Sequence, residues 1–259
     1  MSAAHLRRTV NAVALALSVA LAMPALCAEQ SGSRALPSVK AVMDAYVAAI
    51  GGREVIFKHR SMTIRGEFLA SEKGSAFDRR VYYRDGKMLY EIALPSGQYR
   101  EGFDGQVAWR VHPRTGPALF QGDVVKSKQR DADMHYPARI LDYFHSMEVV
   151  DVADFEGHTC FHLRGTNEWG QVNEQFYDTQ SGLLIGYRFN SAWRGGPGEE
   201  REVFSGYKEF GGWLMPTRAE HKSADGQQVE ITTDVSFDDV PDSVFELPAE
   251  VRALVGKTA

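Results

Sequence analysis

The sequence predicts a mainly β fold in which a large, curved antiparallel sheet is accompanied by two helices. The first observation is a series of turn dipeptides, Asp85-Gly86, Asp104-Gly105 and Asp225-Gly226, which favour the tight turns of β-hairpins. The second is an alternation of apolar and polar residues between these turns. The third is a pair of segments with helical apolar spacing. Many hairpins in succession indicate a meander rather than alternating βα units.

Residues 1–28 have the three-part pattern of a secretory signal. Arg7 and Arg8 form its positive start, an apolar run follows, and small residues precede the expected cleavage site, which is after Ala28 or, as an alternative, after Cys27. Cys27 does not fit a lipid anchor, because Leu26 stands where a lipoprotein signal has a small residue. We therefore expect a soluble periplasmic protein.

The mature chain, residues 29–259, is expected to form a single domain. Cleavage leaves 231 of the 259 residues and changes the formal net charge from −5 to −7, because both arginines are removed. All-β chains of this length are commonly one domain. The acidic balance argues against a nucleic-acid partner. Cys160 is the only cysteine left, so packing rather than an internal disulfide must stabilise the fold.

The mature chain begins with a predicted helix over residues 39–50. Its apolar residues fall on one helical stripe, Pro37 suits the first turn, and Gly51-Gly52 ends the helix, since glycine adopts left-handed conformations readily. A strand is expected from about Ser61. Further alternating runs are Met88/Tyr90/Ile92, Val107/Trp109/Val111, Ile185/Tyr187/Phe189 and Val229/Ile231/Thr233/Val235/Phe237.

A second amphipathic helix is predicted over residues 136–147, where apolar residues recur at offsets of 4, 5, 7, 8 and 11. The two helices need an apolar surface to cover, and a concave sheet face offers one. Two interpretations stay open. If the helices leave the concave face unfilled, it becomes an apolar cavity; otherwise it is an ordinary packed core.

The most distinctive polar pattern is His158, Cys160 and His162. On a strand these three side chains share one face, so they suggest a zinc or copper site. The alternative is a strand with partly solvated histidines, which the roughly 7 Å spacing of such positions favours. No nucleophile, base and oxyanion donor assemble in the sequence, so we expect neither an enzyme nor a cofactor.

Four stretches resemble the periplasmic LolA-type lipoprotein carriers and related outer-membrane lipoprotein-sorting-like proteins. They are, in order, GGREVIFKHRSMTIRGEF, GFDGQVAWRVHP, YKEFGGWLMPTR and VPDSVFELPAEV. The resemblance covers nearly the whole mature chain. It implies an open half-barrel covered by a helical lid, with a cavity that binds acyl chains. The candidate lining residues are Tyr90, Trp109, Phe161, Tyr187 and Phe189.

Arg84 resembles the arginine that, in the carriers, reaches backbone carbonyls of the lid and holds it closed. Arg84 precedes the MLYEI strand, as that arginine precedes its strand, but Asp85-Gly86 follows where the family has proline. The alternative is an exposed residue beside a turn.

We therefore expect a monomeric periplasmic protein that binds lipid or lipoprotein acyl chains, with inner-membrane loading and outer-membrane receiving proteins as partners. One alternative is a lipid-sensing envelope regulatory module. The other is a metal-dependent enzyme using the two histidines and the cysteine. The sequence does not identify the cargo.

Overall fold

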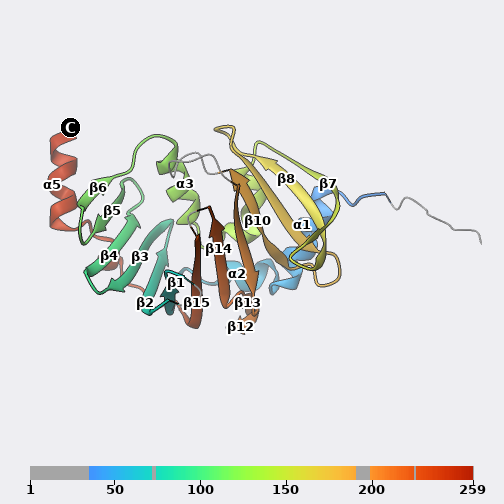
Figure 1. Ribbon diagram of the computed structural model, residues 1–259, viewed down its shortest axis with the longest axis horizontal. Helices are drawn as coiled ribbons and strands as arrows, with labels where there is room; N and C mark the ends of the chain where they lie inside the picture. Colours follow the sequence, from blue (N-terminus) through green and yellow to red (C-terminus); the bar gives the residue numbers. More distant parts are fainter. Residues whose placement is uncertain (1–34, 72–73, 191–198, 225, 259) are drawn as a thin grey trace, which may run out of the picture. The chain divides into compact units, whose positions relative to one another are not determined.

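The computed structural model consists mainly of one open antiparallel sheet, and the two edge strands of this sheet are consecutive in the chain. The structure describes residues 35–71, 74–190, 199–224 and 226–258. Within them, thirteen strands pair in the order β6-β5-β4-β3-β2-β1-β15-β14-β11-β10-β9-β8-β7, and β12 and β13 form a separate hairpin. Since β6 and β7 lie at opposite edges, the segment between them must cross from one edge to the other. The sheet is curved, and α3 lies between its two flanks (Figure 1).

The strands are β1 Ser61–Leu69, β2 Ala76–Arg84, β3 Lys87–Leu94, β4 Gly97–Phe103, β5 Ala108–His112, β6 Gly116–Leu119, β7 Ser146–Phe155, β8 His158–Thr166, β9 Val172–Asp178, β10 Leu184–Asn190, β11 Glu199–Ser205, β12 Lys208–Phe210, β13 Trp213–Met215, β14 Arg218–Ser223 and β15 Gly226–Phe237. The helices are α1 Val39–Ala49, α2 Gly52–Lys58, α3 Asp123–Asp131, α4 Tyr136–Arg139 and α5 Ala249–Thr258, with 3₁₀ turns η1 Ile140–Tyr143 and η3 Asp242–Phe245.

Helix α1 confirms the first predicted helix, and the strand predicted from Ser61 is β1. Ser38 caps α1 by accepting a hydrogen bond from the backbone N–H of Ala41, and Gly51 follows it with φ +116°. Gly51 is also required by close packing, because a Cβ there would lie 2.3 Å from the carbonyl oxygen of Gly212 in the β12–β13 hairpin. The sequence analysis missed α2, which follows directly.

The predicted turn dipeptides occur where strands reverse. Asp85 and Gly86 both have positive φ between β2 and β3, as a type I′ hairpin requires, and Gly105 has positive φ between β4 and β5. Glu156-Gly157 forms a second turn of this kind between β7 and β8. The Asp225 half of the third dipeptide lies outside the described residues.

The lid is the segment of residues 120–145 that connects β6 to β7, and it differs from the predicted second helix. The predicted helix over 136–147 is instead α4 followed by η1, and Phe144 is already extended. The segment has to leave the helical path there to reach the sheet edge at β7. Phe144 packs over Gly165, where a Cβ would lie 2.5 Å from its ring. The lid also contains α3, which the sequence analysis missed.

The apolar core follows the faces of the sheet. On the concave face, α1 buries Val42, Met43 and Tyr46 against β8–β10, and Ile140 of the lid joins the same cluster. On the opposite face, η3 and α5 cover Leu89 and Trp109 with side chains that include Val240, Phe245 and Val251. The sequence analysis missed α5. The mainly β fold with an open sheet is confirmed.

We expect Gly66→Ala to destabilise the mature chain by at least about 2 kcal/mol, because β1 bulges against β15 at this residue. A Cβ on Gly66 would lie 1.7 Å from the carbonyl oxygen of Ile231. Urea unfolding measures the loss. Gly256→Ala in α5 is the matched control, because no atom outside the helix lies within 4 Å of that position. The control should be neutral or slightly stabilising, and equal stability of the two variants would contradict the argument.

Candidate functional site

A cavity of about 1630 Å3 lies on the concave face of the sheet, under the lid. Strands β1–β5, β9–β11 and β13–β15 line its floor and sides, and α3 and α4 contribute residues from the lid. This volume exceeds the roughly 300–1,000 Å3 of most small-molecule sites. The helices therefore do not fill the concave face, and the unfilled cavity is the interpretation that the structure supports.

The apolar part of the lining combines methionines with aromatic rings. Four methionines are present, on three strands and on the lid, and their flexible thioethers adapt to ligands of different shape. Aromatic rings complete this part of the wall. The residues are Met62, Met88, Met134, Met215, Tyr83, Tyr136, Phe144, Tyr187 and Trp213.

Tyrosines in this wall and next to it stay neutral. Burial raises the pKa of Tyr136 to about 12, and burial likewise raises the pKa values of Tyr187, Tyr177 and Tyr46 well above their ordinary range. Tyr46 and Tyr177 stack edge to face with ring centroids 5.2 Å apart. This wall therefore offers rings and hydroxyl groups to a ligand, but no phenolate.

The floor also carries ion pairs. Glu230 on β15 accepts a hydrogen bond from the hydroxyl of Tyr90 at 2.7 Å and pairs with the buried Arg79 at 3.1 Å. This contact raises the pKa of Tyr90, although burial contributes more. Glu200 lies 3.0 Å from Nε2 of His221. The cavity is thus apolar in one part and charged in another.

An ion pair attaches the lid to the floor. Lys128 of α3 lies 2.5 Å from Glu101 of β4, and both side chains are largely buried, with 13% and 16% exposed. Burial alone would lower the pKa of Lys128, but Asp131 and Glu101 more than offset this effect and raise it. The ammonium therefore stays charged beneath the lid.

The structure brings together three of the predicted lining residues. Tyr90, Tyr187 and Phe189 line the cavity. The alternation predicted for Ile185/Tyr187/Phe189 is interrupted by a bulge between Leu184 and Gly186, so Ile185 packs on the other face.

Trp109 and Phe161 lie elsewhere. Trp109 faces away from the cavity and is buried under α5, while its neighbour Ala108 packs toward the lid side with Ala132. Alternation identifies the two faces of a strand but not which one is concave, so Trp109 was assigned to the wrong face. Phe161 packs beneath α1, where it lines a separate cavity of about 200 Å3.

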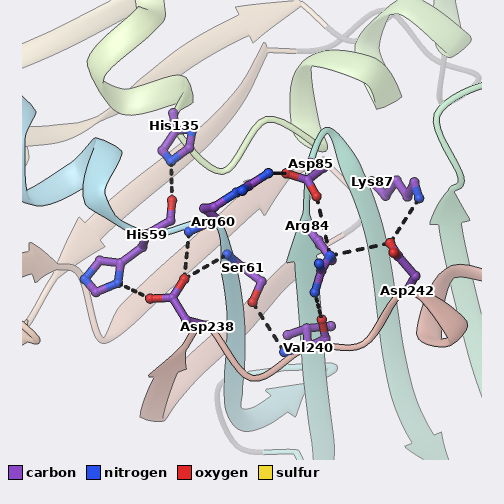
Figure 2. A network of polar contacts seen from close by, with 10 residues as sticks. All are labelled: His59, Arg60, Ser61, Arg84, Asp85, Lys87, His135, Asp238, Val240 and Asp242. Carbon is purple, nitrogen blue, oxygen red and sulfur yellow. Dashed lines mark hydrogen bonds and ion pairs between the residues drawn. The ribbon is translucent and has the colours of Figure 1, made fainter.

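Arg84 does bind a backbone carbonyl, but in the C-terminal segment rather than in the lid. Its Nη1 donates to the carbonyl oxygen of Val240 at 2.6 Å, and its Nε lies 3.4 Å from carboxylates of both Asp85 and Asp242 (Figure 2). Arg84 thereby holds the chain that leads from β15 to η3. The sequence placed it correctly beside a turn, and the structure gives it a partner other than the lid.

Arg84 belongs to a network that we call the polar junction. At its centre Asp238 receives hydrogen bonds from Nδ1 of His59 and from the backbone N–H groups of Arg60 and Ser61 (Figure 2). His135, at the start of α4, donates from Nε2 to the carbonyl oxygen of His59 at 2.9 Å. The other members are Arg84, Asp85, Lys87, Val240 and Asp242.

The polar junction therefore fastens the end of the lid that lies at α4. A second bond supports it, since Nη1 of Arg53 in α2 donates to the carbonyl oxygen of Ala138 at 2.8 Å. The lid is held at α3 by a charged pair and at α4 by hydrogen bonds to backbone carbonyls. Sequence spacing gives no sign of these contacts, because their partners lie far apart in the chain.

The three side chains of the predicted metal site do not converge on an ion. His158 pairs with Asp178, and His162 pairs with Asp151 and stacks on Phe176. Cys160 is fully buried among apolar side chains, and burial raises the pKa of its thiol to about 12. In the part of the chain that the structure describes, no group of three potential ligands could hold a metal. His162 is also buried, contrary to the expectation of partial solvation.

Solved structures with this architecture come from several bacteria. One is a LolA superfamily protein from Nitrosomonas europaea, at 15% identity, covering 82% of this chain and 99% of that one with a TM-score of 0.56. This chain has the LolA-type fold. A DUF1329 family protein from Desulfovibrio piger matches at 13% identity, covering 82% and 98%, with a TM-score of 0.56.

A putative outer membrane lipoprotein-sorting protein domain from Vibrio parahaemolyticus matches at 12% identity over 72% of this chain and 89% of that one, with a TM-score of 0.50. No family model and no curated protein matches the sequence. These identities are low, so the LolA-type likeness is one of fold.

The predicted signal peptide, residues 1–28, lies outside the described residues. None of the helices in the described part of the chain is long and apolar enough to span a membrane.

Replacing Lys128 by methionine should loosen the lid. The change leaves Glu101 buried without its cation, so amide hydrogen exchange in residues 120–134 should accelerate at least about fivefold. Gln129→Met is the matched control on the same helix, because Gln129 is exposed and its replacement should change little. Equal exchange in the two variants would show that the buried pair does not hold α3.

Asp238→Asn should destabilise the mature chain by about 1–2 kcal/mol near pH 7, a modest value because the carboxylate is half exposed. Hydrogen bonds from the Arg60 backbone and from His59 lower the pKa of Asp238 below its ordinary value, so its contribution is present above about pH 4 and is lost as the pH falls further. Thermal unfolding at pH 7 and pH 3 should show the difference between wild type and variant narrowing in acid.

Asp242→Asn is the control within the polar junction. Asp242 is 68% exposed, so this substitution should change the free energy of unfolding by less than about 0.5 kcal/mol. If the difference in stability between wild type and Asp238→Asn stays constant down to pH 3, the ionised carboxylate does not have the role given to it.

Proposed function

We propose that this protein binds the apolar chains of a lipid or lipoprotein in its concave cavity and carries them through the periplasm, without a catalytic step. The observation that carries the proposal is the cavity of about 1630 Å3 that lies between the sheet and the lid. Its methionines and aromatic rings suit apolar chains of varied shape. The LolA-type fold and its match to a putative lipoprotein-sorting domain are consistent with this role.

A carrier must also release its cargo, and the composition of the cavity suits reversible binding. Apolar contact contributes roughly 25 cal/mol per Å2, so a few hundred Å2 give several kcal/mol before entropic costs. The polar part of the lining adds little to this apolar contribution to the binding free energy. The proposal therefore pairs moderate affinity with broad acceptance of chain shapes, and it leaves the loading and receiving proteins to be identified.

A cavity-filling variant tests the proposal. Ala219 lies on β14 and lines the cavity, so Ala219→Phe should reduce the affinity for an uncharged hydrophobic dye, such as Nile red, at least about fivefold. Fluorescence titration measures the affinity, and native mass spectrometry should show less copurified lipid. Ala93→Phe is the matched control, because Ala93 is exposed on β3 between Ile92 and Leu94, which line the cavity.

Wild-type protein that shows neither a saturable dye site nor bound lipid would refute the proposal. Dye binding that falls equally in both variants would place the site outside the cavity. The Ala93→Phe variant should bind as the wild type does.

A further inference from the structure

One strand beside the cavity carries a line of polar side chains into an apolar part of the core. Asn173, Gln175 and Tyr177 alternate along β9 on the concave face. The pairing register places Gln175 directly between Leu163 of β8 and Tyr187 of β10. Asn173 and Tyr187 line the cavity, whereas Gln175 has none of its surface exposed. We call Asn173 and Gln175 the carboxamide pair.

Each member of the carboxamide pair has a buried polar atom without a hydrogen-bond partner among the described residues. In Gln175, Oε1 accepts a hydrogen bond from the Tyr177 hydroxyl at 2.6 Å, but the Nε2 donor has no acceptor. In Asn173, the Oδ1 acceptor has no donor. The bond to Tyr177 thus uses one end of the Gln175 amide and leaves the other end unsatisfied, which is unfavourable in a buried position. A ligand that satisfies both residues would remove this cost.

The unused groups of the carboxamide pair are complementary to a secondary amide. Gln175 offers N–H donors, which suit a carbonyl oxygen, and Asn173 offers a carbonyl oxygen, which suits an N–H group. Alternate positions on a strand lie roughly 7 Å apart. A ligand amide with one hydrogen bond at each end spans about 8 Å, so flexible side chains at this spacing can hold it. An ester has the carbonyl but no N–H group, and an ether has neither.

We propose that the carboxamide pair makes the cavity selective for apolar chains that are attached through an amide bond. This inference rests on the proposed function and specifies the linkage that the cargo carries. The amide N–H donates to Asn173, at the cavity wall. A rotation of the Tyr187 side chain uncovers Gln175, whose Nε2 then donates to the amide carbonyl. The chain itself lies among the methionines and aromatic rings of the wall.

Three uncharged ligands of equal chain length test the selectivity, because they differ only in the linkage. They are N-(2-hydroxyethyl)decanamide, 2-hydroxyethyl decanoate and 2-decyloxyethanol, each used below its aggregation concentration to displace Nile red from the mature protein. We expect the amide to bind about tenfold more tightly than the ether, with the ester between them. A cavity that offers only apolar contact gives the reverse order, because the amide costs the most to remove from water.

Gln175→Met and Asn173→Leu should each reduce the ratio of amide to ether affinity at least about threefold, while the ether binds as before. Gln175→Met also removes the acceptor of the Tyr177 hydroxyl. Asn173→Leu leaves that bond intact, so it tests the carboxamide pair even if Gln175→Met does not fold. Gln98→Met is the matched control, because Gln98 is exposed on β4 beside the cavity-lining Tyr99 and therefore lies on the opposite face of the sheet.

The outcomes separate this inference from the proposed function. If the ether displaces the dye as well as the amide does, the inference fails while the proposed function stands. The inference is also overturned if Asn173→Leu keeps the wild-type ratio, or if Gln98→Met lowers the ratio as much as the variants of the carboxamide pair. If none of the three ligands displaces the dye, the proposed function itself fails.

Discussion

The rest of the structure depends on one constraint: β6 and β7, which are consecutive in the chain, do not pair with each other and form the two edges of the sheet. Because β1 pairs with β15, the two ends of the strand series meet in the middle of the sheet, and its edges are the consecutive strands β6 and β7. The lid must therefore cross from one edge of the sheet to the other, and it does so over the concave face. A closed barrel would need no such crossing and would narrow its interior. The order of the strands thus sets the crossing, and the side chains of the sheet and the lid decide whether the space beneath it stays open and what its chemistry is.

Open edges carry a risk of pairing with other chains, and both edges here are protected. Strand β6 is four residues long, contains Pro117 and lies beside α5. Strand β7 is longer, but it is bulged between Val149 and Asp151 and presents exposed acidic residues. These features make it less favourable for another chain to pair with either edge, while the sheet itself stays open. They are compatible with a sheet that stays open for a ligand.

The sequence predicted those parts of the fold whose causes are local. Gly51 ends α1, and Asp85-Gly86 turns β2 into β3, because backbone conformation at these residues depends on the glycine itself. Helix α3 was missed because its segment, DVVKSKQRD, has no apolar stripe and is held by charges such as Lys128. Trp109 was misassigned because alternation does not show which face of the sheet is concave. Tyr90, Tyr187 and Phe189 line the cavity, whereas the contact of Glu230 with Arg79 follows from the strand register, which sequence alone does not provide.

The ionic groups in the cavity argue that its lining is adapted to a ligand and not to stability. An ion pair with a buried partner, such as Arg79 with Glu230, is often no more stabilising than apolar residues of similar volume, because the buried charge must be desolvated. Replacing the methionine and tyrosine wall with tightly packed aliphatic residues would likewise fill the space and add apolar burial. The chain keeps both the ion pair and the methionine and tyrosine wall. The Tyr90 hydroxyl donates to Glu230, and this part of the floor is therefore polar. A fold selected only for stability would close this space, whereas a space kept open between apolar and charged side chains is expected of a ligand-binding site.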